Sequence, residues 1–274
     1  MKLRIWEQGL VATYSLPGYR EFILEHYAAY QRPGTEIVVH GVRDDASEAA
    51  AKIAGRAVNY AYLHRFHDTQ IIENVRRAAR ESFDAVIIGV LQDPGLKEAR
   101  SVVDIPVIGY GEVSMLTACM HGSRFAFAAI NPDMDPLLRA MIREQGLESR
   151  AAPTAYMDCG YPDLSDAVRG KPERFLAAFD AAARRSIREH GVDVILPGQT
   201  IIAELLWRAG IREIDGALVL DPRLPLLRMA EMLVDMRRAG FGVSRRGFYW
   251  AKPPADLEQG VRDFYAKPER GRDG

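Results

Sequence analysis

The sequence has few cysteines and no excess of charge of either sign. Cys119 and Cys159 are the two cysteines among 274 residues, and their spacing excludes a disulfide framework and a CxxC metal or redox pair. The 36 Lys and Arg residues nearly balance 37 Asp and Glu residues, which gives a formal net charge of -1. A chain with so little net charge has no long-range electrostatic field that would attract the phosphate groups of a nucleic acid. We therefore expect no nucleic-acid partner.

Long apolar runs and nucleotide-binding patterns are also missing. No uninterrupted apolar stretch approaches the roughly 20 residues of a membrane span, and the start MKLRIWEQG is not followed by an apolar run of signal-peptide length. The phosphate-binding patterns GxGxxG and GxxxxGK[ST] do not follow any predicted strand. We therefore expect a cytoplasmic protein that needs no cofactor and no membrane partner.

Short β-branched runs alternate with longer helical patterns, and this alternation predicts an α/β fold with mainly parallel sheets. Helical spacing of apolar residues predicts amphipathic helices over Gln70–Arg80, Pro136–Glu144 and Phe175–Glu189. The predicted strands are Lys2–Trp6, Glu36–His40, Asp84–Ile88, Pro106–Ile108, Arg124–Ala129, Ala155–Asp158, Asp193–Leu196 and Ala217–Leu220.

The sequence contains two short segments that resemble each other, and we call this similarity the internal echo. Asp84–Gly89 reads DAVIIG and Asp193–Gly198 reads DVILPG, and each segment follows an amphipathic helical pattern. The echo predicts two pseudo-symmetric halves, each a mainly parallel sheet flanked by helices, with the active site in the cleft between them. We expect residues 1–109 plus 217–254 to form the first half, residues 110–216 the second half, and residues 255–274 a tail, with Lys267–Gly274 loose at its end.

Ligands of open parallel sheets bind beyond the carboxyl ends of the strands, so the residues that follow each predicted strand are the candidates for a site. Thr200 also begins a run, TIIAELL, that is typical of a helix start, where backbone N–H groups suit an anion. The candidate positions are Glu7–Gly9, His40, Gly89–Asp93, Gly109–Glu112, Asn131, Asp158–Cys159 and Gly198–Thr200.

Two neighbouring segments carry a family resemblance. Asp84–Leu96 (DAVIIGVLQDPGL), followed by Val103–Met115 (VDIPVIGYGEVSM), resembles the hydantoin/allantoin racemase branch of the aspartate/glutamate racemase superfamily. The closing Ser244–Pro254 (SRRGFYWAKPP) is similar to the end of that branch, and the resemblance runs from about Met1 to Pro254. It implies two pseudo-symmetric halves around a shared active site, as the internal echo does.

The resemblance also implies two catalytic cysteines, one from each half, that remove and return the proton next to a carbonyl. In this sequence those two positions hold Val90 and Gln199. Valine cannot transfer a proton, and an amide is no useful base near neutral pH. The family's asparagine-rich loop after the first strand is replaced by WEQG, in which Glu7 is titratable.

We therefore predict an enzyme that acts on a small carboxylate or cyclic amide through an enolate-like intermediate, as a lyase, a hydrolase or a non-thiol isomerase. Glu7 is the predicted base, and His40 or His67 is its predicted titratable partner. The predicted substrate-binding residues, of which Gln92, Gln199 and Thr200 would donate hydrogen bonds, are Gln8, Val90, Leu91, Gln92, Glu112, Asn131, Gln199 and Thr200. We expect a homo-oligomer whose partner is a small-molecule substrate.

Three alternatives remain open from the sequence. The chain could be a hydantoin-type racemase that uses other bases, a metal-dependent hydrolase that uses His40, His64 and His67, or a binding protein that holds a small acid without chemistry. Two acidic residues also have structural interpretations. Glu112 could stabilise a helix N-terminus, and Asp93 before Pro94 is typical of a helix cap.

Overall fold

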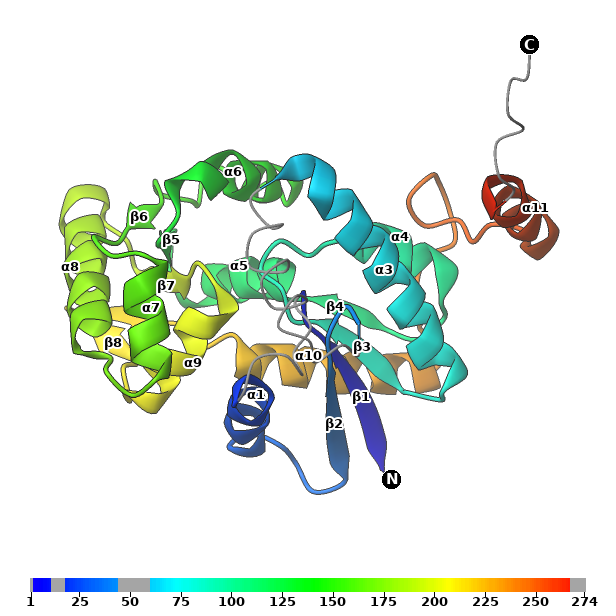
Figure 1. Ribbon diagram of the computed structural model, residues 1–274, viewed down its shortest axis with the longest axis horizontal. Helices are drawn as coiled ribbons and strands as arrows, with labels where there is room; N and C mark the ends of the chain where they lie inside the picture. Colours follow the sequence, from blue (N-terminus) through cyan, green and yellow to red (C-terminus); the bar gives the residue numbers. More distant parts are fainter. Residues whose placement is uncertain (1, 11–17, 44–59, 267–274) are drawn as a thin grey trace, which may run out of the picture.

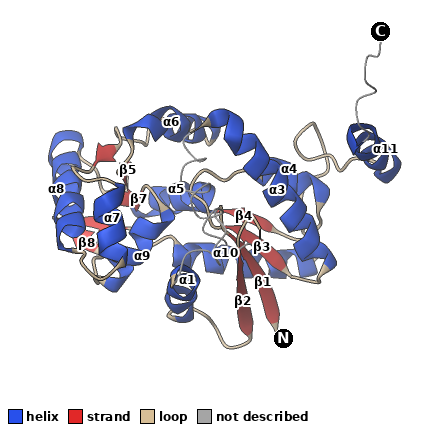
Figure 2. Cartoon of the chain, in the orientation of Figure 1, coloured by secondary structure: helices blue, strands red, loops and turns tan. Residues whose placement is uncertain are grey.

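The computed structural model describes residues 2–10, 18–43 and 60–266, so the predicted loose end Lys267–Gly274 lies outside the described residues. Its strands form two separate sheets (Figures 1 and 2). The first sheet has the order β2-β1-β3-β4, and the second has the order β6-β5-β7-β9-β8. The strands are β1 (Leu3–Gln8), β2 (Thr35–His40), β3 (Ala85–Ile88), β4 (Val107–Gly109), β5 (Phe125–Ala129), β6 (Ala155–Tyr156), β7 (Val194–Pro197), β8 (Glu213–Ile214) and β9 (Ala217–Val219).

The first four strands of each sheet follow the same spatial order, and all of their pairings are parallel. The echoed segments DAVIIG and DVILPG fall on β3 and β7, the third strand of each sheet. The predicted α/β fold with two mainly parallel sheets is therefore confirmed. The short strand β8 was not predicted; it pairs antiparallel with β9 at the edge of the second sheet.

Helices cover both sheets, as the parallel pairing requires. They are α1 (Tyr19–Ala28), α3 (Ala61–Arg80), α4 (Leu96–Val102), α5 (Tyr110–His121), α6 (Asp135–Glu144), α7 (Tyr161–Val168), α8 (Glu173–His190), α9 (Thr200–Arg208), α10 (Arg223–Arg238) and α11 (Ala255–Ala266), with a 3-10 helix η2 (Pro132–Met134) before α6. The predicted helix over Gln70–Arg80 is the second half of the longer α3, while α6 and α8 closely match their predicted ranges.

The chain crosses between the two sheets twice. Helix α5 leads from β4 to the second sheet, and α10 returns to pack against β3, β4 and α5. Residues of α5 and α10 join apolar side chains from both sheets in one core cluster. The predicted return at residue 217 comes slightly too early, because β9 still pairs with β7, and the return follows β9.

Helix α11 projects from the body of the molecule near α3 (Figure 1). Its contacts with α3 include the ion pairs of Arg262 with Glu73 and of Glu258 with Arg76. Its large apolar residues, Leu257, Val261, Phe264 and Tyr265, are all exposed. The predicted tail therefore contains a helix. None of the helices in the described ranges combines the length and the apolar character needed to cross a membrane.

Candidate active site

A cavity of about 190 Å³ lies where loops from the two sheets meet. Its lining includes residues of β1 and the loop after it, of α1, of the loop after β3, and of the start of α9. The lining residues are Glu7, Gly9, Leu10, Tyr19, Ile23, Val39, Gly89, Val90, Leu91, Gln92, Met134, Tyr161, Gln199, Thr200 and Ile201. Val90 and Gln199, which come from different halves, thus share one pocket, as the sequence predicts.

Glu7 is the buried carboxyl group of this pocket. Its side chain points to the face of the first sheet that α1 and α10 cover, and the whole residue is 1% exposed. Glu7 Oε1 lies 2.5 Å from Arg223 Nη1, and Glu7 Oε2 accepts a hydrogen bond of 2.8 Å from the hydroxyl of Tyr27. Burial raises the pKa of Glu7, and the opposing effect of Arg223 and Tyr27 does not cancel it. The wall of the cavity therefore carries a buried carboxyl group whose pKa lies above the ordinary value.

Arg223 is the residue that holds Glu7, and sequence analysis missed it. It is the first residue of α10, and it is completely buried. Its guanidinium also contacts Glu204 on α9. Arg223 Nε lies 2.8 Å and Arg223 Nη2 lies 2.7 Å from Glu204 Oε1. Buried arginine and glutamate residues are rare unless they are paired. A signal was present, because Glu204 interrupts the apolar run TIIAELL, but that signal does not identify its partner.

His40 and Gln8 lie on the opposite face of the first sheet from Glu7. Neighbouring residues of a strand point to opposite faces, and Gln8 pairs with His40 across β1 and β2. The ring of His40 stacks on Trp6 with 3.4 Å between centroids, and Trp6 Nε1 donates a hydrogen bond of 3.0 Å to Gln8 Oε1. The prediction that His40 is the titratable partner of Glu7 is therefore wrong, because the pleat of the sheet separates the two side chains.

The other predicted positions also lie outside the pocket lining. His67 is on α3, Glu112 forms an ion pair of 2.5 Å with Arg100, and Asn131 accepts a hydrogen bond of 3.1 Å from the Asp133 amide at the start of η2. The structure thus brings six of the predicted site residues together in the pocket: Glu7, Val90, Leu91, Gln92, Gln199 and Thr200.

The predicted metal ligands do not form a metal site. The rings of His64 and His67 are 6.5 Å apart at their centroids, and His40 is stacked on Trp6. Among the residues that the structure describes, no three His, Cys, Asp or Glu side chains are grouped so that they could hold a metal ion. The set of His40, His64 and His67 is therefore wrong as a ligand set.

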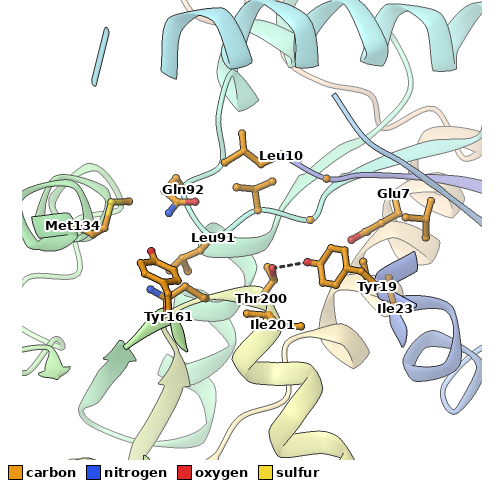
Figure 3. A pocket seen from close by; sticks show the side chains of 15 residues that line it. Glu7, Leu10, Tyr19, Ile23, Leu91, Gln92, Met134, Tyr161, Thr200 and Ile201 are labelled. Atoms are coloured by element: carbon orange, nitrogen blue, oxygen red, sulfur yellow. Dashed lines mark hydrogen bonds between the residues drawn. The ribbon is translucent and has the colours of Figure 1, made fainter. Parts of the chain in front are cut away.

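The rest of the pocket is apolar with a few polar groups, among which sequence analysis missed two tyrosines. The Tyr19 hydroxyl lies 3.5 Å from Thr200 Oγ1, which joins α1 to the start of α9 (Figure 3). Burial raises the pKa of Tyr19, so its hydroxyl keeps its proton and can donate it in a hydrogen bond. Tyr161 lies near Gln92 and Met134, on the side of the pocket away from Glu7 (Figure 3). Gln199 Oε1 is buried and has no hydrogen-bond partner within the described ranges.

Asp93 fixes the loop that carries Gln92. Its two carboxyl oxygens accept hydrogen bonds from the backbone amides of Gly111 (2.9 Å) and Glu112 (2.7 Å) at the start of α5. Burial raises the pKa of Asp93 to about 8, against the opposing effect of those two amides. The prediction of a helix cap is right in kind, but the helix is α5 rather than one that begins at Pro94, since α4 begins at Leu96.

Two sheets with the same strand order, which share a pocket at the carboxyl ends of their strands, define a two-lobed α/β protein. Residues 19–230 match the sequence model of Asp/Glu/Hydantoin racemase, and the chain belongs to this family. A hydantoin racemase from Pseudomonas sp. (strain NS671) is 27% identical over 166 residues, which cover 61% of this chain and 64% of that protein, slightly under two thirds of its length.

A hydantoin racemase from Paenarthrobacter aurescens is 27% identical over 188 residues, which cover 68% of this chain and 75% of that protein. Among solved structures, the allantoin racemase from Klebsiella pneumoniae superposes with a TM-score of 0.70 at 22% identity. That superposition covers 92% of this chain and 94% of the other, and it establishes the likeness of the fold.

Proposed function

We propose that the protein is a racemase that exchanges the proton on the carbon next to the carbonyl of a small cyclic amide. The observation that carries this proposal is the buried carboxyl group of Glu7 in the pocket that Val90 and Gln199 also line. Membership of the racemase family and the names of the two hydantoin racemase relatives support an isomerase. They give no support to the lyase or hydrolase that the sequence led us to expect.

In the proposed reaction, Glu7 begins as a carboxylate. The bond between the reacting carbon and its hydrogen breaks, the proton moves to a Glu7 oxygen, and the electron pair is delocalised onto the carbonyl oxygen. Arg223 and Tyr27 each engage one oxygen of Glu7, and a carboxylate oxygen has two lone pairs, so both oxygens retain an acceptor site. Because burial raises the pKa of Glu7, the carboxylate is a stronger base than an exposed one.

Polar groups around the cavity support a cyclic amide over a simple carboxylate. The Gln199 side-chain oxygen is buried without a partner among the described residues, and an amide N–H of the substrate would satisfy it, whereas a carboxylate has no proton to offer it. The hydroxyls of Tyr19 and Thr200 and the first-turn amides of α9 can donate to the oxygen on which charge develops. Tyr161, across the cavity from Glu7, is the proposed donor to the other face of the planar intermediate.

Racemisation in heavy water tests the proposal directly. Single enantiomers of substituted hydantoins and of allantoin would be incubated with the protein, with NMR recording the loss of the proton signal and polarimetry recording the loss of rotation. Exchange should accompany racemisation, and Glu7→Gln should slow both roughly 100-fold or more because an amide keeps the shape but cannot accept the proton.

Glu36→Gln is the matched control, because Glu36 lies on the neighbouring strand and pairs with Lys2. It should leave the rate unchanged. Substrates that are bound but keep both their proton and their rotation would exclude racemisation. Full activity of the Glu7→Gln variant would remove Glu7 from the mechanism.

A further inference from the structure

The contacts of Glu7 continue past Arg223 into a chain of buried charged groups. Arg223 reaches Glu204 Oε1, and the other carboxylate oxygen of Glu204 contacts His26 Nδ1 on α1. The second ring nitrogen, His26 Nε2, lies 2.8 Å from Asp221 Oδ2 in the segment between β9 and α10. This charged chain (Glu7, Arg223, Glu204, His26 and Asp221) connects α1, α9 and the start of α10 to the pocket.

His26 is held between two carboxylates. Its side chain is completely buried, and its ring stacks on Trp207 with 4.4 Å between centroids. Burial opposes the charged imidazolium, but hydrogen bonds to Asp221 and Glu204 outweigh burial and raise the pKa of His26. Both ring nitrogens face carboxylate oxygens, and both can donate at once only when the ring carries its second proton.

The charged chain contains three carboxyl groups and two groups that carry positive charge, so the two cations must be shared. Arg223 contacts both Glu7 and Glu204. When His26 is protonated, it neutralises part of the charge of Glu204, and more of the field of Arg223 acts on Glu7. When His26 is neutral, Glu204 and Glu7 compete for one guanidinium, and the carboxylate form of Glu7 is less favoured.

From these contacts we infer that His26 is a positioning residue that governs, through Glu204 and Arg223, how readily Glu7 gives up its proton. The inference rests on the proposed function of Glu7 as the proton acceptor. It assigns His26 a role in the reaction although His26 does not line the pocket.

Other charged and titratable groups face this chain, and they remain in place in the variants below. Tyr19 lies within the field of Arg223, Glu204 and Glu7, and Arg212 contacts Tyr30. Tyr27 on α1 bonds to Glu7, Tyr30 donates a hydrogen bond of 2.6 Å to Asp221, and Tyr110 on α5 lies 5.8 Å from the Arg223 guanidinium at its ring centroid. Burial raises the pKa of Tyr27 and of Tyr110 well above the ordinary value, so these hydroxyls do not compete with Glu7 in titration.

Two substitutions with opposite expected signs test the inference. His26→Gln removes a positive charge, so the titration midpoint of Glu7 should move to higher pH. Glu204→Gln removes the carboxylate that competes for Arg223, so the midpoint should move to lower pH. His121→Gln is the matched control, because His121 is exposed at the end of α5, and it should move nothing.

The readout is a carboxyl-carbon NMR titration of the substrate-free protein with labelled glutamate, in which the signal lost in Glu7→Gln assigns Glu7. The pH profile of deuterium exchange is measured alongside it. On the acid side of the profile the His26→Gln variant should be about threefold or more slower than the wild type, and on the alkaline side the two rates should converge.

Midpoints that do not move, or that move in the same direction in both variants, would overturn the inference. If the His26→Gln variant does not fold, the Glu204→Gln variant alone tests the inference. A titration midpoint of Glu7 that does not move to lower pH in that variant would also overturn it. Midpoints that move apart as expected in a protein without exchange activity would support the role of His26 and refute the proposed function, so the two failures are distinguishable.

Discussion

The carboxyl group of Glu7 occupies the space that a side chain at position 89 would need. A Cβ atom built on Gly89 would lie 1.9 Å from Glu7 Oε1 and 2.7 Å from its carboxyl carbon. Arg223 and Tyr27 each hold one oxygen of that carboxyl group. The first residue after β3 is therefore a glycine for a steric reason that concerns the site.

This relationship predicts that Gly89→Ala displaces Glu7. A catalytic group that moves by about 1 Å can lose roughly 100-fold in rate, and we expect a loss of that order in deuterium exchange. Gly242→Ala is the matched control, because a Cβ atom there would meet no atom within 4 Å. An alanine at position 89 with full activity would mean that Glu7 does not act from its observed position.

The doubly paired His26 predicts a pH-dependent contribution to stability. Its pKa is raised in the folded protein, so its stabilising contribution is fully present below the unfolded value of about 6.5 and is lost as pH rises through the folded pKa. His26→Gln should therefore lower the free energy of unfolding by about 2 to 3 kcal/mol in acidic buffer. The difference between wild type and variant should shrink as pH rises.

Urea unfolding of both proteins across a pH series measures this difference. A gap that stays constant, or widens toward alkaline pH, would show that His26 is not held as an imidazolium. His121→Gln again provides the comparison with an exposed histidine.

Val90 and Gln199 share the pocket at the positions where the family resemblance implies two thiols. The double variant Val90→Cys with Gln199→Cys should therefore gain a racemase activity that does not depend on Glu7. Gln199 is the N-cap of α9, and a helix N-terminus lowers the pKa of a thiol placed there. We expect the new activity to survive Glu7→Gln and to be lost on alkylation.

Each single cysteine variant is the control for the double variant, because exchange at both faces requires both groups. Reactivity toward a thiol reagent checks that the introduced groups are accessible. Accessible thiols without any gain in racemisation would contradict the expectation that positions 90 and 199 correspond to the two thiols that the family resemblance implies.

Asp93 predicts a coupled loss of stability and substrate binding. Asp93→Ala leaves two amides of α5 without their acceptor, and the loss of such a cap costs about 1 to 2 kcal/mol. The backbone of Asp93 is also in the left-handed region, with φ of 47°, so the loop that presents Gln92 should shift when the cap is lost. Urea unfolding and the KM for the best substrate measure both effects. Asp158→Ala, at an exposed position, should change neither.

The sequence predicted the parts of this molecule that depend on local pattern. The β-branched runs marked eight of the described strands, and the rule that ligands bind at the carboxyl ends of strands brought Glu7, Gln92 and Gln199 into one site. Strand β8 has only two residues and was missed because so short a run carries no period. The prediction that His40 is the partner of Glu7 failed because side chains alternate between the two faces of a sheet. A one-residue step along β2 reverses the face to which a side chain points.

The charged chain could not be predicted in the same way. Arg223 follows Glu7 by 216 positions and Glu204 follows His26 by 178, and nothing in a single sequence links groups so far apart. His26 lies in the helix sequence YREFILEHYA, and histidine is a residue type of only intermediate burial, so the residue type alone does not predict complete burial. The two crossings of the chain bring these residues together, so they become visible only once the topology is known.

The return of the chain through α10 has a consequence for how this protein folds. The carboxyl group of the pocket is encoded in the first strand, whereas its guanidinium partner is encoded after the last described strand, 216 positions later. During synthesis, Glu7 would have to stay in water or stay neutral until α10 arrives. The ion pair of Glu7 with Arg223 can therefore form only after every described strand of the second sheet has been synthesised, because those strands precede α10 in the chain.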